Sequence, residues 1–234
     1  SSWTAGGALI TGRRALGGAG TQNAALGFGG STLAFESNTN VSCTEEYDGS
    51  SWTAGGALIT GRRCLAGAGT QTAGLAFGGS INDNFCNETC TEEYNGSSWT
   101  TGGTKIYHSG VGGAGTQNAA LAMGGVFFGT LSCTEEYNGT SWATGGALIT
   151  ARCNFSSFGT QNSAVAAGGC GNSDLLSIEN YDGTSWAESS TLPSLATCSA
   201  GAGTNSSSGL IIGGCQNPTN TTVISQIVGK KIIK

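Results

Sequence analysis

The sequence is short of the residues that catalytic and metal sites usually need. Its 234 residues include one histidine and two prolines, only 10% are charged, and the formal net charge is -5. Proteins that bind nucleic acid gather lysine and arginine on one face, so this composition excludes a nucleic-acid partner. The single histidine, His108, and the lack of two cysteine pairs at finger-like spacing argue against a zinc site. We therefore expect no cofactor, no metal and no catalytic activity.

Long apolar runs are also missing. No stretch reaches the ~20 consecutive apolar residues of a membrane helix, so we expect no membrane insertion. The first residues lack the charged-then-apolar pattern of a secretory signal, which leaves the export route unreadable. Glycine is abundant instead, with 42 residues, but it has no every-third-residue period, and this excludes collagen.

A repeat runs through the whole chain. Five tryptophans are separated by 49, 47, 43 and 44 residues, and a Gly-Gly doublet follows each of them after 25 to 27 residues. Tyrosine stands five residues before each of the last four tryptophans. Such a period is typical of propellers and solenoids. The tryptophans are Trp3, Trp52, Trp99, Trp142 and Trp186, the tyrosines are Tyr47, Tyr94, Tyr137 and Tyr181, and the repeat units cover residues 3–51, 52–98, 99–141, 142–185 and 186–234.

Each unit predicts four short strands. In the second unit these are about residues 64–69, 73–78 and 91–94, with a fourth that opens at Trp99. Asn95-Gly96 before the fourth strand favours a tight hairpin, because both residues tolerate positive φ angles. Four strands cannot bury their own faces, so the units must stack around an axis. We predict an all-β fold, a five-bladed β-propeller with four-stranded blades that forms a single domain over residues 1–234.

The two ends of the chain predict how the ring closes. Trp3 stands at a fourth-strand position, and residues 222–228 fit the third strand of the last unit. We therefore predict that the N-terminal strand, residues 1–12, pairs with the C-terminal blade. Such pairing would remove an exposed sheet edge.

The repeated order of a Gly-Gly doublet after an apolar strand, then Glu-x-Tyr-Asp or Glu-x-Tyr-Asn, then Trp, resembles the Kelch repeat over the whole chain. The spelling of residues 91–100, Thr-Glu-Glu-Tyr-Asn-Gly-Ser-Ser-Trp-Thr, also resembles Kelch-like sequences of phages and environmental bacteria. The resemblance implies that the repeated tyrosines and tryptophans pack between neighbouring sheets. The chain departs from the usual Kelch pattern in having five units rather than six or seven, and in its high glycine content.

Charged residues recur with the repeat. Glu45, Glu92, Glu135 and Glu179 lie two residues before the tyrosines, and Arg13, Arg62 and Arg152 lie ten after the tryptophans. We predict blade-to-blade ion pairs, for instance Glu45 with Arg62, because arginine suits a bidentate clasp on a carboxylate. The alternative is an array of arginines that binds an anionic glycan.

The nine cysteines predict disulfides if the protein is extracellular. Cys153 and Cys170 are symmetric about a predicted hairpin turn, as are, nearly, Cys198 and Cys215. We predict these two disulfides and, as a third, Cys64 with Cys86. The alternative is that the cysteines fill small apolar slots as thiols.

Strand alternation places the turns inside hairpins on one face of the ring, the hairpin face. The loops between second and third strands, and the segments that cross to the next unit, lie on the other, the crossing face. Between the Gly-Gly doublet and the repeated glutamate, 14, 12, 9 and 9 residues intervene in the first four units. Variable loops on a rigid scaffold commonly bind partners. The candidate binding residues are Phe35, Asn82, Asp83, Phe85, Lys105, Tyr107, His108, Phe127 and Phe128.

These features predict a non-catalytic binding or structural module, extracellular or on a virion surface, that recognises a glycan or a partner protein through the crossing face, as part of a larger assembly. One alternative is a cytoplasmic Kelch-type adaptor that binds proteins. Another is a carbohydrate-active enzyme, for which His108 would be the starting point. For the aromatic residues of the loops, the alternative to binding is that they only cover the sheet edges.

Overall fold

The computed structural model describes residues 3–32, 39–81, 88–106, 112–171, 173, 175–216, 219–220, 224–228 and 231–233, and side chains only as far as Gly214. These residues form five four-stranded antiparallel sheets and one two-stranded sheet. No helix occurs in the described part of the chain, and so none that is long and apolar enough to cross a membrane. The all-β prediction is confirmed.

The strands follow one another in chain order within each sheet. The first sheet contains β1 (Gly17–Thr21), β2 (Ala24–Phe28), β3 (Thr44–Tyr47) and β4 (Trp52–Ala54), and the second β5 (Ala66–Gly69), β6 (Gly74–Phe77), β7 (Thr91–Tyr94) and β8 (Trp99–Thr101). The third contains β9 (Gly112–Thr116), β10 (Ala119–Met123), β11 (Thr134–Tyr137) and β12 (Trp142–Thr144), and the fourth β13 (Ser156–Thr160), β14 (Ser163–Ala167), β15 (Ser177–Tyr181) and β16 (Trp186–Thr191). The fifth contains β17 (Ala200–Asn205), β18 (Ser208–Ile212), β21 (Ile224–Val228) and β22 (Lys231–Ile233), and β19 (Cys215–Gln216) pairs with β20 (Thr219–Asn220).

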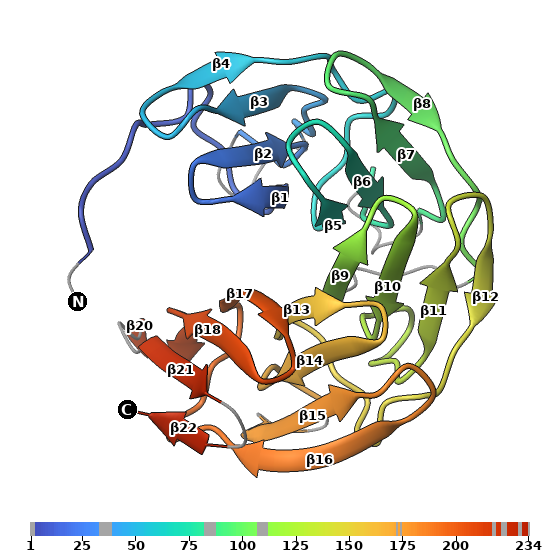
Figure 1. Ribbon diagram of the computed structural model, residues 1–234, viewed down its shortest axis with the longest axis vertical. Helices are drawn as coiled ribbons and strands as arrows, with labels where there is room; N and C mark the ends of the chain where they lie inside the picture. Colours follow the sequence, from blue (N-terminus) through green and yellow to red (C-terminus); the bar gives the residue numbers. More distant parts are fainter. Residues whose placement is uncertain are drawn as a thin grey trace.

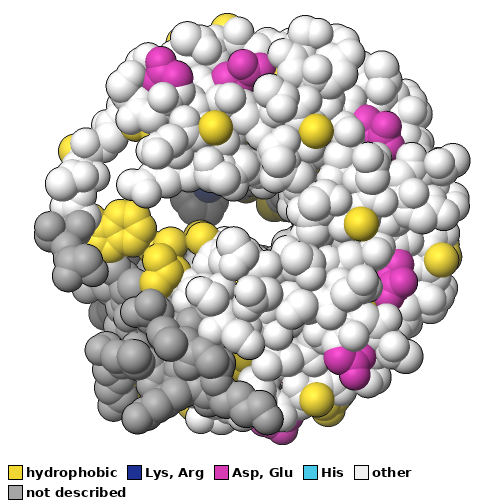
Figure 2. Space-filling model, viewed as in Figure 1, with side chains coloured by type: hydrophobic (Ala, Val, Ile, Leu, Met, Phe, Trp, Pro, Cys, Tyr) yellow, Lys and Arg dark blue, Asp and Glu magenta, His cyan; other side chains and the backbone are white. Residues whose placement is uncertain are grey.

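The sheets are arranged around a central axis, with the first strand of each innermost and the fourth at the rim (Figure 1). Contacts between neighbouring sheets run along the inner strands in the order β1, β5, β9, β13, β17. Glycine makes this close approach possible: a Cβ at Gly67 would lie 2.3 Å from the carbonyl oxygen of Gly18 in the preceding sheet. Figure 2 shows an opening at the centre of the ring and acidic side chains spaced around one face.

The hairpin turn between the third and fourth strands is built in the same way in each of the first four sheets. In the first sheet, the Asp48 carboxylate accepts hydrogen bonds from the backbone N–H groups of Ser50 and Ser51, both at 2.8 Å. These bonds lower the pKa of Asp48 to about 2. Gly49 takes a φ of 96°, a conformation that glycine adopts without strain. The counterparts of Asp48 are Asn95, Asn138 and Asp182.

Three interfaces between sheets repeat one set of hydrogen bonds. At the interface of the second and third sheets, the indole N–H of Trp142 donates to the Thr91 hydroxyl at 2.9 Å, and the Tyr137 hydroxyl donates to Glu93 at 2.6 Å. The amide of Gln117 donates to the carbonyls of Gly74 and Tyr94, at 3.0 and 2.7 Å. The interfaces on either side repeat these bonds with Trp99, Tyr94 and Gln71, and with Trp186, Tyr181 and Gln161. The resemblance to Kelch repeats implied this packing of tyrosine and tryptophan between sheets.

The end of the ring differs from the prediction. We expected the N-terminal strand to complete the last sheet, but β22 pairs with β21 and holds the fourth position there. Residues 3–12 form no strand, and Trp3 is 67% exposed. The physical reason is that Val228 pairs with Lys231 in antiparallel strands, so the C-terminal segment supplies both outer strands of its own sheet.

Candidate functional site

Four buried ion pairs link the start of each of the first four units to its own third strand. They are Arg13 with Glu45, Arg62 with Glu92, Lys105 with Glu135, and Arg152 with Glu179. All seven residues predicted for ion pairs take part, but the pairs lie within a unit and not between units. The example of Glu45 with Arg62 was therefore wrong, because the segment that carries Arg62 has already crossed to the second sheet.

The glutamate carboxylates also accept hydrogen bonds from backbone N–H groups of the crossing segments. Glu92 accepts the N–H groups of Ile59 and Thr60 at 2.7 and 3.3 Å, and Glu45 accepts those of Ile10 and Thr11 at 2.7 and 3.2 Å. Burial on its own would raise the pKa of Glu45, but these N–H groups and the Arg13 guanidinium outweigh it and lower that pKa. With their arginines enclosed in these pairs, no array of free guanidiniums exists here to bind an anionic glycan.

Lys105 does not belong to a binding surface. The prediction placed it on the crossing face, but it is 3% exposed, and its ammonium lies 2.5 Å from the Glu135 carboxylate and 5.0 Å from the centre of the Trp142 ring. Its backbone takes the place that Leu58 and Leu148 hold in neighbouring units, and its long side chain replaces the arginine there. Burial lowers the pKa of Lys105, although Glu135 opposes this effect. Sequence reasoning missed the exchange because the lysine lies four residues earlier in its unit than the arginines do.

Phe127 and Phe128 lie on the crossing face in a tight loop closed by pairing of Val126 with Thr130. Their rings are in edge contact, with 4.6 Å between centroids. Phe128 is 95% exposed and has a φ of 53°, which is costly for a bulky side chain. The other predicted binding residues, Phe35, Asn82, Asp83, Phe85, Tyr107 and His108, lie outside the described residues.

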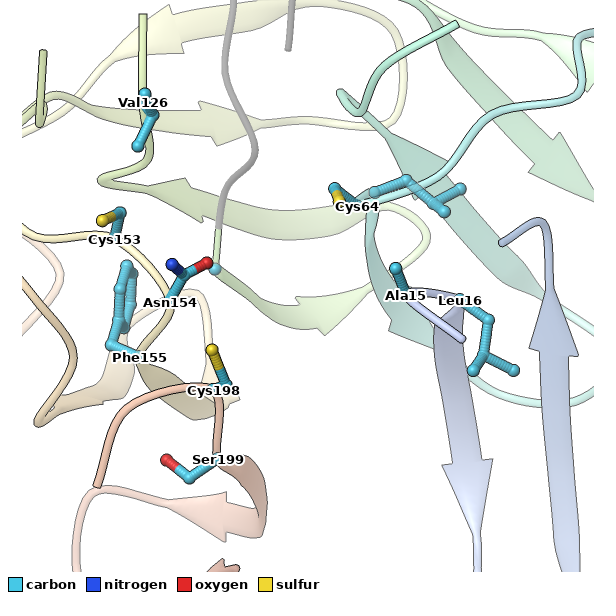
Figure 3. A pocket seen from close by; sticks show the side chains of 11 residues that line it. Ala15, Leu16, Cys64, Val126, Cys153, Asn154, Phe155, Cys198 and Ser199 are labelled. Carbon is cyan, nitrogen blue, oxygen red and sulfur yellow. The ribbon is translucent and has the colours of Figure 1, made fainter. Parts of the chain in front are cut away.

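A cavity of about 560 Å³ opens where the crossing segments reach the inner strands. Figure 3 shows Ala15 and Cys64 on one side of it, with Asn154, Phe155 and Cys198 opposite. Four of these residues have φ between 52° and 55°: Ala15, Cys64, Asn154 and Cys198. Backbone hydrogen bonds link these residues across neighbouring sheets. The Cys64 N–H donates to the Ala15 carbonyl at 2.8 Å, and the Cys198 N–H donates to the Asn154 carbonyl at 2.7 Å.

The chemistry of this cavity suits binding. Among the described residues, those that line it carry no carboxylate and no imidazole. Nowhere in the part of the chain that the structure describes do three histidine, cysteine or acidic side chains gather as metal ligands. The volume of the cavity falls within the range of pockets for small ligands, about 300–1,000 Å³. Asn154, which is exposed at its edge, offers a polar amide.

Of the predicted disulfides, the structure brings one pair together. Cys153 and Cys170 exchange backbone hydrogen bonds of 2.8 and 2.9 Å, and their sulfur atoms lie 2.8 Å apart. Cys198 is at the cavity, but the side chain of its predicted partner Cys215 is outside the described part, and so is Cys86, the predicted partner of Cys64.

A row of exposed isoleucines was not predicted. Each stands just after a buried or partly buried residue of the crossing segment, and the exposed fraction of the isoleucines ranges from 49% to 62%. They are Ile10, Ile59, Ile106 and Ile149. Each isoleucine is fixed through its N–H, which donates to the buried glutamate of its unit. The repeat itself was the signal, since a residue seven after each of four tryptophans is isoleucine.

Comparison with known proteins supports the fold. A solved structure titled "Structure of YjhT" matches with a TM-score of 0.80 and 16% sequence identity, covering 99% of this chain and 87% of that one. At this identity the likeness shows the fold alone. No protein-family model and no curated protein matches the chain. The sheets around a common axis and this structural match make the protein a β-propeller.

Proposed function

We propose that the protein is a Kelch-like propeller in which the five sheets are blades, and that it is a non-catalytic module that binds a glycan through its crossing face. We place it outside the cell or on a virion surface, as part of a larger assembly. The observation that carries the proposal is Phe128, an almost fully exposed aromatic ring on a backbone that disfavours it.

Two costs support a binding role for Phe128. A positive φ for such a residue costs about 1–3 kcal/mol, and strain of this kind collects at functional sites. The exposed ring also gives up the burial that normally stabilises a phenylalanine. Aromatic faces stack against the apolar faces of sugars, and the cavity and Asn154 on the same face add room and a hydrogen-bonding group.

The test is binding to an array of purified bacterial polysaccharides. We expect Phe128→Ala to weaken binding at least roughly tenfold, a loss of one aromatic contact. Phe128→Tyr keeps the ring and should retain binding. Phe128→Gly should lose binding while it leaves the melting temperature unchanged or higher, because glycine relieves the positive φ. Binding that survives both Phe128→Ala and Phe128→Gly would rule out this site.

A partner protein is the second candidate, and the isoleucine row favours it. Four exposed isoleucines at one position of successive units offer apolar contact that a sugar does not need. If the ligand is a protein, Ile59→Ser and Ile149→Ser together should weaken its capture more than Phe128→Ala does.

We also propose that Cys153 and Cys170 form a disulfide when the protein is in an oxidising compartment. Residues paired in this way have Cα atoms ~5.5 Å apart, within the range that a disulfide spans. The two thiols would lose two protons and two electrons to an oxidised disulfide such as glutathione disulfide. Alkylation without reduction, followed by peptide mapping, should find both cysteines unmodified and Cys43 and Cys133 alkylated. Alkylation of all four in secreted material would refute the disulfide.

A further inference from the structure

A pair of backbone hydrogen bonds joins the crossing segment to the residue after the Gly-Gly doublet in the first, second and fourth units. The donor and acceptor atoms of these bonds are 2.8 to 3.0 Å apart. The bonds pair Arg14 with Ser31, Arg63 with Ser80, and Cys153 with Cys170. Serine serves at this bridge in the first two units, so the fold alone does not require the two thiols of the fourth unit.

The segment that carries Cys153 also holds the base of the loop that presents Phe128. The Gly125 N–H donates to the Arg152 carbonyl at 2.9 Å, and the Arg152 N–H donates to the Leu131 carbonyl at 3.2 Å. Gly125 and Leu131 are the two ends of the loop, since the Leu131 N–H donates to the Gly125 carbonyl at 2.9 Å. The exposed ring is therefore supported by the backbone next to Cys153.

Asn154, which offers its amide at the edge of the cavity, follows Cys153 directly. The side-chain N–H of Asn154 donates to the Cys170 sulfur at 3.7 Å, and its backbone carbonyl accepts from the Cys198 N–H at 2.7 Å. Figure 3 shows Val126, Cys153 and Asn154 along one side of the cavity. The cysteine pair thus contacts one group to which we assign ligand binding and adjoins the support of the other.

The two thiols are placed to form a disulfide. Their sulfur atoms lie 2.8 Å apart, and Cys170 is partly exposed whereas Cys153 is buried. The Cys170 thiolate would attack one sulfur of glutathione disulfide and release one glutathione. The Cys153 thiolate would then attack the Cys170 sulfur and release the second. One S–S bond breaks in the oxidant and one forms in the protein, and the two glutathione molecules leave with the two protons and two electrons.

We propose that this disulfide regulates the ligand site of the crossing face, so that the oxidised chain binds ligand more tightly than the reduced chain does. The S–S bond prevents the bridge between Cys153 and Cys170 from opening, and so it fixes Arg152 and Asn154 on either side. A reduced chain has to order these groups when ligand binds, and this ordering lowers the affinity. The inference rests on the proposed ligand binding through Phe128 and the cavity.

Hydrogen exchange of the full chain without ligand tests the first step. One sample is oxidised with glutathione disulfide and the other is reduced with dithiothreitol. We expect faster exchange after reduction at the N–H groups of Gly125, Leu131 and Cys153, because opening of the bridge exposes them. Cys170→Ser places serine where the first two units have it, and it should exchange like the reduced chain under both conditions. The matched variant Cys43→Ser should keep the response.

The second step is measured with whichever polysaccharide of the array the oxidised chain binds best. Reduction should weaken binding roughly three- to tenfold. Cys170→Ser should bind as the reduced chain does, with or without dithiothreitol. Equal affinities of the oxidised and reduced chains would overturn the proposal. A response to dithiothreitol that persists in Cys170→Ser would overturn it too, because other cysteines would then be responsible.

The two measurements separate this inference from the proposed function. A chain that binds no polysaccharide in either state refutes the proposed glycan binding. The exchange rates then decide whether the disulfide fixes the Phe128 loop, and equal rates at Gly125 and Leu131 in the two states refute that as well.

Discussion

Arg62→Met is expected to lower the free energy of unfolding by about 3–5 kcal/mol, the usual loss when one partner of a buried ion pair is removed. The Arg62 side chain is fully buried, and Glu92, 3% exposed, would lose the charge that balances it. Glu92 holds the N–H groups of Ile59 and Thr60 as well, so the crossing segment between the first two sheets would loosen with it.

Urea unfolding followed by tryptophan fluorescence measures this loss. Arg14→Met is the matched control, because it is the same substitution at an exposed arginine. It should change the free energy of unfolding by no more than about 1 kcal/mol. Equal losses in the two variants would contradict a stabilising role for the buried pair. The double change Arg62→Met with Glu92→Leu should recover part of the loss, since no buried charge is left alone.

Trp142→Ala is expected to cost about 3–5 kcal/mol, as large-to-small changes in a core do. Trp142 packs 5.0 Å from the Phe77 ring and 4.9 Å from the Tyr137 ring, and its N–H is bound to Thr91. The change would open a cavity between the second and third sheets and leave the buried Thr91 hydroxyl without its donor.

The chain supplies its own control for this variant. Trp52 holds the same position in the repeat, but it is only half-buried and its N–H donates to the Gly7 carbonyl. Trp52→Ala should therefore cost clearly less than Trp142→Ala in the same thermal or urea unfolding experiment. An equal or larger loss at Trp52 would contradict the prediction that the more deeply buried tryptophan contributes more to stability.

The sequence predicted the parts of the fold that repetition encodes. Asn95-Gly96 and its counterparts marked the hairpins because the turn needs a residue free to adopt positive φ. Tyrosine and tryptophan recur because three interfaces between sheets make the same hydrogen bonds, and the buried glutamates recur because each one holds the crossing segment of its own unit. These local requirements can be read from spacing alone.

Contacts that depend on the path of the chain in space could not be predicted from the spacing of residues in the sequence. Arg62 pairs with Glu92 rather than Glu45 because the crossing segment ends over the second sheet, a fact of three-dimensional position. Lys105 reaches a buried carboxylate from a different backbone position, because its flexible four-carbon stem spans the difference. The β21–β22 hairpin lacks the tyrosine and tryptophan of other units, so the pattern hid it.

The candidate site also has one part that the sequence predicted and one part that it did not. Phe127 and Phe128 stood out because they interrupt a loop of small residues, and the structure places them in a strained, exposed turn. The cavity beside the inner strands depends on four residues with positive φ, among them Ala15 and Cys64, which have no sequence signature for that conformation.

Hydrogen exchange with and without a bound polysaccharide tests whether ligands bind the crossing face. We expect slower exchange on binding at residues 126–130 and at Cys153 and Asn154, with no change in the hairpin turns at Ser50–Ser51 and Thr140–Ser141. Protection confined to those hairpin turns would contradict it.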